Sequence, residues 1–322
     1  MATLREIKGR ISSVRSTLKI TSAMKLVSSS KLRRAQLAIE AMRPYQRQMD
    51  GILEALLSAG ARIPEAKGKE GAPVAIVAVS SNASLCGGFN SSVIAKVKAV
   101  LADNPDAVVY CAGRKVADAM RKIGKPSPEN LNALSEKPAY GPAAALAGKL
   151  MDDFAEGRIS KVMLVYSHFV SSAKQVAVAE QLLPAAEVYE IHSAPLEPRY
   201  DKESPLEPRY DKDSPLEPRY DKEASLVIPS GGEAGVEESD FIVEPSAQEM
   251  LSALFPKSIK LKLYTALLDS AASEHAARTI AMQTATDNGE NLLAELTLIY
   301  NKTRQQKITT EILDLAGGKI EE

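Results

Sequence analysis

The sequence predicts an α/β protein in which long helices at the two ends of the chain form an antiparallel coiled coil around an open sheet domain. Three observations support this prediction. Apolar residues recur at alternating spacings of three and four near both termini. Between the termini, short apolar runs alternate with helical patterns. The two stripes lie roughly 180 residues apart, which favours an antiparallel pair closed through a folded domain. An ordinary helical bundle is the alternative for both stripes.

The first predicted element is one long helix over residues 1–60. Its apolar stripe covers positions 4 to 42, and nine of the twelve stripe positions are apolar. The polar positions are consecutive in the stripe, which indicates that the helix there leaves its ordinary partner for a more polar one. They are Thr21, Lys25 and Ser28. Pro44 is expected to bend or interrupt the helix, whose pattern continues to Gly60.

The pattern of residues 72–186, in the middle of the chain, predicts the α/β domain. Strands are expected at residues 74–80, 107–112, 161–169 and 175–182. Helices are expected at residues 90–101, 114–123 and 142–155. This alternation favours an open, mostly parallel sheet covered by helices, to which residues 239–245 would add a last strand.

The last predicted element is a helix over residues 246–322. Small residues cluster between positions 266 and 285, where they would let the backbone of a partner helix approach closely. Further along this helix, large apolar side chains are expected to fill the seam: Leu292, Leu296, Ile299 and Leu313. The pair Asn288 and Gly289 is the one weak point, because glycine costs about 1 kcal/mol relative to alanine inside a helix.

Composition restricts the function. The 40 basic and 41 acidic side chains nearly balance, so net charge favours neither nucleic acid nor lipid as a partner. The first 40 residues are nonetheless basic, and this face meets either solvent or an acidic partner. Cys86 and Cys111 lie in segments predicted to be buried, which favours a reduced, cytosolic protein. No signal peptide, transit peptide or membrane-spanning run is expected.

Gly87 and Gly88 follow the first predicted strand, where a glycine-rich turn before a helix can form a phosphate site. The local sequence is not a dinucleotide fingerprint, and no phosphate-binding loop motif occurs in the chain. The glycines are expected to make a turn, with Asn90 capping the next helix. The three histidines and two cysteines show no metal-ligand spacing. We therefore expect no catalytic residue, cofactor or metal. A nucleotide-binding α/β enzyme with coiled-coil arms and a basic-helix nucleic-acid binder remain alternatives.

Eight segments along the chain carry recognisable motifs: residues 2–34, 43–45, 85–90, 273–278, 281–282, 285–289, 300–305 and 308–311. In this order they resemble the γ subunit of rotary F-type ATP synthases, bacterial type. The resemblance covers nearly the whole chain except about residues 187–238.

The resemblance implies a non-catalytic rotor subunit with a Rossmann-like central domain. In that family the paired termini form an asymmetric shaft inside a ring of three α and three β subunits, and the domain sits on the c ring beside the ε subunit. Proton flow turns the c ring and the shaft, which changes the conformation of catalytic sites on the β subunits. The resemblance implies no nucleic-acid partner. It implies a peripheral position on the cytoplasmic face of the bacterial inner membrane, with membrane association only through the complex.

The resemblance also assigns contact residues. Four align with a polar belt near the shaft tip that contacts a loop of the ring: Arg304, Gln305, Thr309 and Glu311. Met24 and Lys25 align where the first helix meets the lever region of a β subunit, and there the heptad pattern fails. Ordinary solvated helix surface is the alternative for the residues of the polar belt.

Residues 187–238 depart from the family pattern. An eight-residue unit beginning at Pro195 recurs at Pro205 and Pro215, and its density of proline and charge argues against a packed core. An exposed or disordered acidic insertion is expected, with a small hairpin or docking strip as the alternative. The insertion contains no cysteine, so thiol switching is excluded there. It is either a brake on rotation or a tolerated linker. The segment 82–84 also differs from the family, which puts any special role of that turn in doubt.

Overall fold

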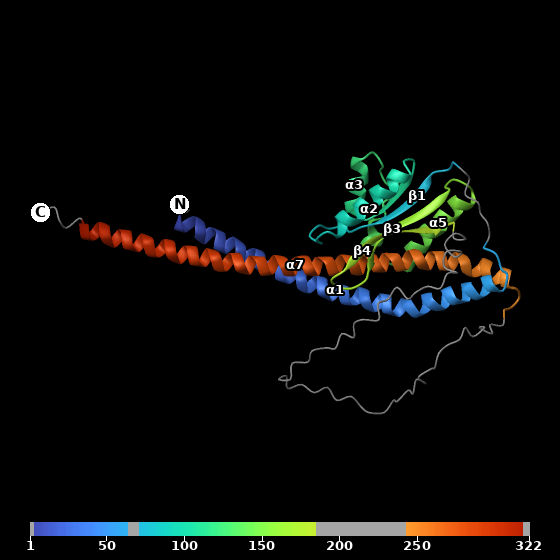
Figure 1. Cartoon of the computed structure of the whole chain (residues 1–322), viewed down its shortest axis with the longest axis horizontal. Helices are drawn as coiled ribbons and strands as arrows, with labels where there is room; N and C mark the ends of the chain where they lie inside the picture. Colours follow the sequence, from blue (N-terminus) through green and yellow to red (C-terminus); the bar gives the residue numbers. More distant parts are fainter. Residues whose placement is uncertain (1–2, 64–70, 185–242, 318–322) are drawn as a thin grey trace, which may run out of the picture.

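The computed structural model describes residues 3–63, 71–184 and 243–317. They form a long two-helix shaft with a head attached to one side, near one end (Figure 1). The shaft consists of α1 (Leu4–Ser58) and α7 (Ala247–Gly317). α7 lies between the head and α1, so the head is carried by α7 (Figure 1). The predicted insertion, residues 187–238, lies outside the described residues.

The two shaft helices are antiparallel, as predicted. Ile7 and Ile11 near the start of α1 pack against Leu296 near the end of α7. At the opposite end of the shaft, Leu53 of α1 packs in one cluster with Leu251 of α7. Distant ends of the chain are therefore held together by separate apolar clusters along the shaft.

The expected interruption at Pro44 is wrong, because α1 runs through this residue without a break. A proline inside a helix loses one backbone hydrogen bond and costs about 3 kcal/mol. The burial of Met49, Leu53 and Leu56 against α7 beyond this point offsets that loss. α7 likewise continues through Pro256.

The polar stretch of the α1 stripe does not leave its partner, so that expectation is also wrong. Thr21 and Ser28 are both buried in the shaft. The Thr286 hydroxyl of α7 donates a hydrogen bond to the Thr21 hydroxyl at 3.0 Å. The two helices approach each other closely at Gly289, because a Cβ atom added there would lie 2.7 Å from Cδ2 of Leu18.

Of the large apolar side chains expected in the seam near the end of α7, only one is buried. Leu296 is buried, whereas Leu292, Ile299 and Leu313 are 45%, 50% and 64% exposed. Leu292 and Ile299 lie on turns of α7 that still pair with α1, but Leu293, Leu296 and Tyr300 are the residues that pack against it there. Leu313 lies beyond the start of α1 at Leu4 and has no helix to pack against among the described residues.

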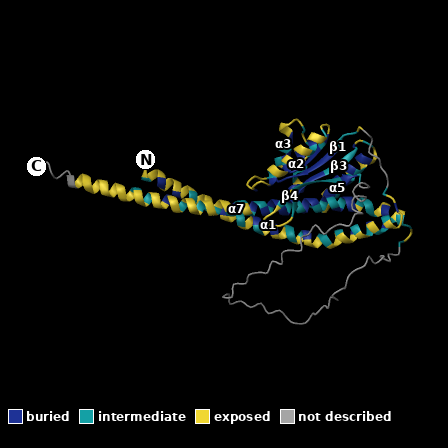
Figure 2. Ribbon diagram, viewed as in Figure 1, coloured by how far each residue is buried: buried dark blue, intermediate teal, exposed yellow. Residues whose placement is uncertain are grey.

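The head contains a four-stranded sheet in the order β2-β1-β3-β4. β1, β2 and β3 are parallel, and β4 is antiparallel to β3. The strands are β1 (Val74–Val79), β2 (Val108–Ala112), β3 (Lys161–Phe169) and β4 (Gln175–Leu183). The sheet is the buried centre of the head (Figure 2). The predicted parallel character is therefore confirmed.

Helices cover both faces of the sheet. α2 (Phe89–Asp103) and α3 (Arg114–Lys122) pack on one face through residues such as Val93 and Met120. α5 (Tyr140–Ala155) and the first half of α7 pack on the other face, where Leu150 and Leu263 join the same core cluster. A short helix, α4 (Asn132–Glu136), was not predicted. α7 is thus both a shaft helix and a layer of the head.

The last strand expected at residues 239–245 is not seen in the part that is described. Residues 243–245 form no strand, and residues 239–242 lie outside the described residues. Val243 packs with the apolar cluster at the end of the shaft that contains Leu53 and Leu251. Pro245 has no amide hydrogen with which to join a strand ladder.

Candidate functional site

Four predicted contact residues lie together on the free end of α7. Tyr300 still packs against the first turns of α1, and the helix beyond it has no partner among the described residues. All four side chains are exposed: Arg304, Gln305, Thr309 and Glu311. Their own contacts are local. The Thr309 hydroxyl donates to the Gln305 carbonyl at 2.9 Å, and Glu311 lies 3.7 Å from the ammonium of Lys307. Their polar atoms are therefore available to another molecule.

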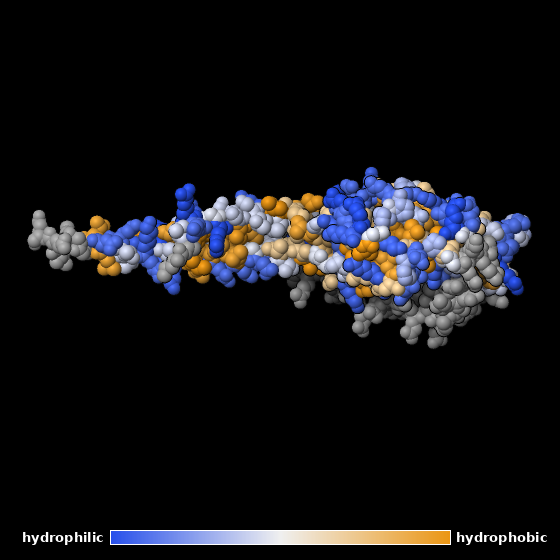
Figure 3. Space-filling model, turned by 90° about the horizontal axis from the view of Figure 1, so that it is seen from above, coloured by the Kyte–Doolittle hydropathy of each residue, from blue (hydrophilic) through white to orange (hydrophobic). Residues whose placement is uncertain are grey.

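The same end of α7 carries an exposed apolar strip. At 3.6 residues per turn, Arg304 and Glu311 share one side of the helix, and Gln305 and Thr309 share another. The apolar side chains between these two rows are Ile308, Ile312 and Leu315, which are 41%, 59% and 76% exposed. Hydrophobic residues are visible along the shaft toward this tip (Figure 3). An apolar strip with polar borders has the composition of a surface that a partner covers.

Met24 and Lys25 lie in the middle of the shaft, and the structure does not bring them near the tip. Both are partly exposed on α1. Their turn of α1 is paired with α7 near Thr286, which lies 18 residues before Arg304, or about 27 Å along the helix. The neighbouring Leu26 and Val27 are 74% and 56% exposed, so this part of α1 also shows apolar side chains to its surroundings.

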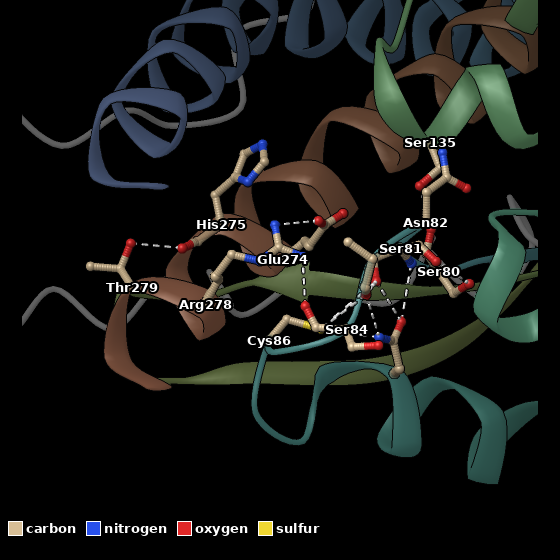
Figure 4. Close-up of polar contacts among 12 residues, drawn as sticks. Ser80, Ser81, Asn82, Ser84, Cys86, Ser135, Glu274, His275, Arg278 and Thr279 are labelled. Atoms are coloured by element: carbon tan, nitrogen blue, oxygen red, sulfur yellow. Dashed lines mark hydrogen bonds and ion pairs between the residues drawn. The ribbon is translucent and has the colours of Figure 1, made fainter. Parts of the chain in front are cut away.

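A buried ion pair within α7 lies where this helix packs against the head. Glu274 and Arg278 lie 2.7 Å apart, and each side chain is only 11% exposed. Arg278 also donates to the Ser84 carbonyl at 3.5 Å (Figure 4). The Ser273 hydroxyl donates to the Ser167 carbonyl at 3.0 Å. We call these five residues the head–shaft joint. Burial raises the pKa of Glu274, although Arg278 opposes this effect.

Sequence reasoning missed this joint. The spacing of four residues between Glu274 and Arg278 is a signal for an ion pair on one helix face. That spacing does not reveal whether the face is buried, because most charged helical pairs lie in solvent. The burial comes from the head, whose loop closes over this turn of α7.

The loop between β1 and α2 is held by hydrogen bonds from side chains. Asn90 does not cap α2 as expected, since Gly88 is the N-cap residue. The Asn90 side chain instead accepts hydrogen bonds from the Ser81 amide at 3.1 Å and the Ser81 hydroxyl at 3.0 Å. Gly87 has a φ of +54°, and a Cβ atom added there would lie 3.8 Å from the carbonyl oxygen of Ala277. Glycine at this position therefore allows a turn that packs closely on α7.

Asn82 ties this loop to α3. Its side-chain oxygen accepts a hydrogen bond from the Arg114 amide at 2.9 Å. Its backbone carbonyl accepts two more from the Arg114 guanidinium, at 3.1 and 2.7 Å. The turn at residues 82–84 thus has a structural role in this chain.

A second ionic contact joins β3 to α7. His168 Nδ1 lies 2.6 Å from a carboxylate oxygen of Asp269. This hydrogen bond raises the pKa of His168, with smaller effects from Glu180, which raises it, and from Arg43, which lowers it. The protonated imidazole is therefore favoured by folding.

We expect Asp269→Asn to destabilise the protein more at low pH than at high pH. A histidine whose pKa is raised by folding stabilises fully below its unfolded value of about 6.5, and that contribution is lost as the pH rises through the folded value. Because His168 is about one-third exposed, the loss should stay below about 1 kcal/mol. Urea unfolding at pH 5.5 and 8.5 measures it. Asp152→Asn, on the exposed face of α5, is the control. An equal loss at both pH values would contradict this assignment.

Within residues 3–63, 71–184 and 243–317, no group of three or more histidine, cysteine, aspartate or glutamate side chains could hold a metal ion. None of the helices in those ranges has the length and hydropathy needed to cross a membrane. Cys86 and Cys111 are unpaired and buried, as predicted from their segments.

The sequence matches a family model described as ATP synthase over residues 3–319. The ATP synthase gamma chain of Phocaeicola vulgatus is 42% identical over 327 residues, which cover 99% of this chain and 100% of that one. The ATP synthase gamma chain of Bacteroides thetaiotaomicron is 41% identical over 328 residues, which cover all of both chains. That of Flavobacterium johnsoniae is 36% identical over 326 residues, which cover 99% and 98%.

Solved structures show the same fold. A rotor chain of the Euglena gracilis mitochondrial ATP synthase has a TM-score of 0.57 at 17% identity, over 95% of this chain and 98% of that chain. A chain of the Tetrahymena thermophila mitochondrial central stalk and c ring has a TM-score of 0.51 at 23% identity, over 83% and 99%.

Proposed function

The chain belongs to the family of ATP synthase gamma chains, and from its structure we propose how it works as the central-stalk subunit of that enzyme. It is not itself catalytic, because catalysis takes place on the β subunits. Its task is to couple rotation of the c ring to conformational change in the ring of α and β subunits. Its partners are this ring, the ε subunit and the c ring.

The observation that carries the mechanism is the continuity of the head core with α7. Ile259 and Leu263 of α7 belong to the same buried cluster as β1, β3 and α5. A torque applied to the head therefore reaches α7 through a packed core, and α1 follows because it shares an apolar seam with α7. The head and the shaft would turn as one body.

The shape of the shaft supplies the second requirement. α1 and α7 have unequal lengths, and their exposed faces differ along the shaft. Such a shaft has no threefold symmetry, so each of three surrounding β subunits would meet a different face at any moment. Differential contact is what biases a conformational equilibrium. We infer that this asymmetry sets different states at the three sites.

Two surfaces are proposed as the contacts. The polar rows formed by Arg304 and Glu311 and by Gln305 and Thr309 would meet a loop of the ring at the tip. Met24 and Lys25 would meet a β subunit lower on the shaft. The support is their exposure, together with the apolar strip at the tip and the exposed Leu26 and Val27 beside Met24. The assembly would be peripheral on the cytoplasmic face of the bacterial plasma membrane. The proposed role of residues 187–238 is that of a tolerated linker.

Replacing the four tip residues together with alanine tests the proposal. Each lost contact is worth about 1 kcal/mol, so we expect ATP synthesis by the reconstituted complex to fall at least about tenfold. The unfolding midpoint of the chain should not change, because all four side chains are exposed. Lys96→Ala with Lys98→Ala, on the exposed face of α2, is the control. Normal synthesis in the tip variant would rule out the tip contact.

A further inference from the structure

A polar hollow lies beside the head–shaft joint, with a volume of about 450 Å³. Its walls come from α1, the β1–α2 loop, the start of α3, α4 and α7. It sits beyond the carboxyl end of β1. In the sheet, β1 lies between β2 and β3, so the chain passes from β1 to β2 on one side and later enters β3 on the other side. In open α/β sheets, ligands bind in this position. We call this hollow the joint pocket.

The charges around the joint pocket are mostly positive. Its cations are Lys31, Arg114 and Arg278, and its anions are Glu136 and Glu274, so three positive charges face two negative ones. Glu274 is already paired with Arg278. The other two cations come from α1 and from the first residue of α3, on different walls. The pocket therefore has an excess of positive charge that no buried anion neutralises.

Hydrogen-bond donors remain unused on these cations. The Lys31 ammonium is exposed and has no hydrogen bond or ion pair with any described residue. Arg114 uses Nε and Nη2 on the Asn82 carbonyl, which leaves Nη1 without a partner in the described part of the chain. Two donors on opposite walls are thus free to bind one shared acceptor.

His275 supplies an independent observation. Its Nδ1 atom is buried and has no hydrogen-bond partner among the described residues. Unsatisfied buried polar atoms are rare in folded proteins, and each one requires an explanation. Burial, and then the charges of Arg278 and Lys31, lower the pKa of His275 to about 4. An acceptor in the pocket would satisfy this imidazole and offset the neighbouring cations. In Figure 4, His275 projects from α7 above Glu274 and Arg278.

We propose that the joint pocket binds a phosphate group, held by Lys31, Arg114 and His275. The ligand is either inorganic phosphate or the terminal phosphate of a nucleotide. A tetrahedral oxyanion suits the site because it accepts hydrogen bonds from several directions at once. Bound there, it would connect α1, the head and α7, and it would stiffen the attachment of the head to the shaft. The site goes beyond the rotor function, which stands on the tip contacts and not on this pocket.

The test uses the full-length chain with isotope-labelled histidine. The sequence has three histidines, so His168 and His192 serve as internal references. Inorganic phosphate is added at pH 7 and constant ionic strength, and the nuclear magnetic resonance signals of the imidazoles are followed. We expect a saturable shift of the His275 signals with a dissociation constant on the order of 1 mM. The signals of the reference histidines should not move.

Lys31→Gln should weaken phosphate binding at least about tenfold, because it removes a charged donor. Lys8→Gln removes the same charge from the far end of α1 and should bind as the unmodified chain does. A repeat with adenosine diphosphate identifies the source: tighter binding assigns the site to a nucleotide phosphate, and equal or weaker binding assigns it to free phosphate. The proposal is overturned by a His275 shift that is absent, unsaturable or matched by chloride, or by unchanged affinity in Lys31→Gln.

Discussion

Gly113→Ala is expected to destabilise the head by about 3–6 kcal/mol, through backbone strain and overpacking together. Gly113 has a φ of +122°, and a Cβ atom there would lie 2.2 Å from the Ser80 carbonyl oxygen. Ser80 cannot move away easily. Its amide donates to Ala112 at 2.8 Å, and its hydroxyl accepts from the Val116 amide at 3.0 Å. The Ser135 hydroxyl also donates to the Ser80 carbonyl. The collision is therefore between parts of the backbone that the sheet and α3 hold in place.

Urea unfolding followed by circular dichroism measures this effect. Gly124→Ala is the matched control, since Gly124 also has a positive φ, +77°, but no atom lies within 4 Å of the added Cβ. That control should lose only about 1–2 kcal/mol from backbone strain. Equal losses in the two variants would show that the contact with Ser80 does not matter.

Arg278→Met is expected to destabilise the protein by about 3–5 kcal/mol at neutral pH, because it leaves the Glu274 carboxylate buried without its partner. The size of this effect follows from the 11% exposure of both side chains. Methionine keeps much of the side-chain volume, so loss of charge is the main change. The double variant with Glu274→Gln should recover most of the loss, since replacing both members of a buried pair is often nearly neutral.

The loss in Arg278→Met should shrink as the pH falls. Burial already raises the pKa of Glu274, and removing Arg278 takes away an influence that lowers it. A carboxyl whose pKa is raised by folding binds more protons in the native state, so the stability of the variant increases at low pH. Unfolding at pH 5 and pH 8 measures this difference.

Lys307→Met is the control for the ion pair, because Lys307 and Glu311 are 64% and 62% exposed. An exposed pair contributes at most about 1 kcal/mol. If Lys307→Met and Arg278→Met were equally unstable, the joint would not be the source of the effect.

The strands were predicted closely because their signal is local. The expected strands at residues 161–169 and 107–112 correspond to β3 (Lys161–Phe169) and β2 (Val108–Ala112). Short apolar runs bounded by polar turns leave few alternatives for a buried strand. The two long helices were predicted for the same reason, since a stripe of alternating three and four spacing repeats over many turns.

The wrong predictions have a different cause. Each concerned a residue whose environment is set by the helix that packs against it, and the local sequence does not show that helix. Pro44 was expected to bend or interrupt α1, and the interruption is absent because later residues pack on α7. Thr21 was expected to face a new partner, but Thr286 of α7 provides a hydroxyl for it. Ile299 was expected in the seam, but Leu296 and Tyr300 occupy the side of α7 that packs against α1.

The element types, the parallel character of the sheet and the pairing of the chain ends could be predicted from the amino-acid sequence, because they follow from periodic patterns and from short, regular connections. The way the head is joined to the shaft could be learned only from the folded molecule. Glu274 and Arg278 become a buried pair, and Gly113 an irreplaceable glycine, because segments far apart in the chain meet there. Whether a residue is buried or closely approached depends on both of the segments that pack together, and a local sequence pattern describes only one of these segments.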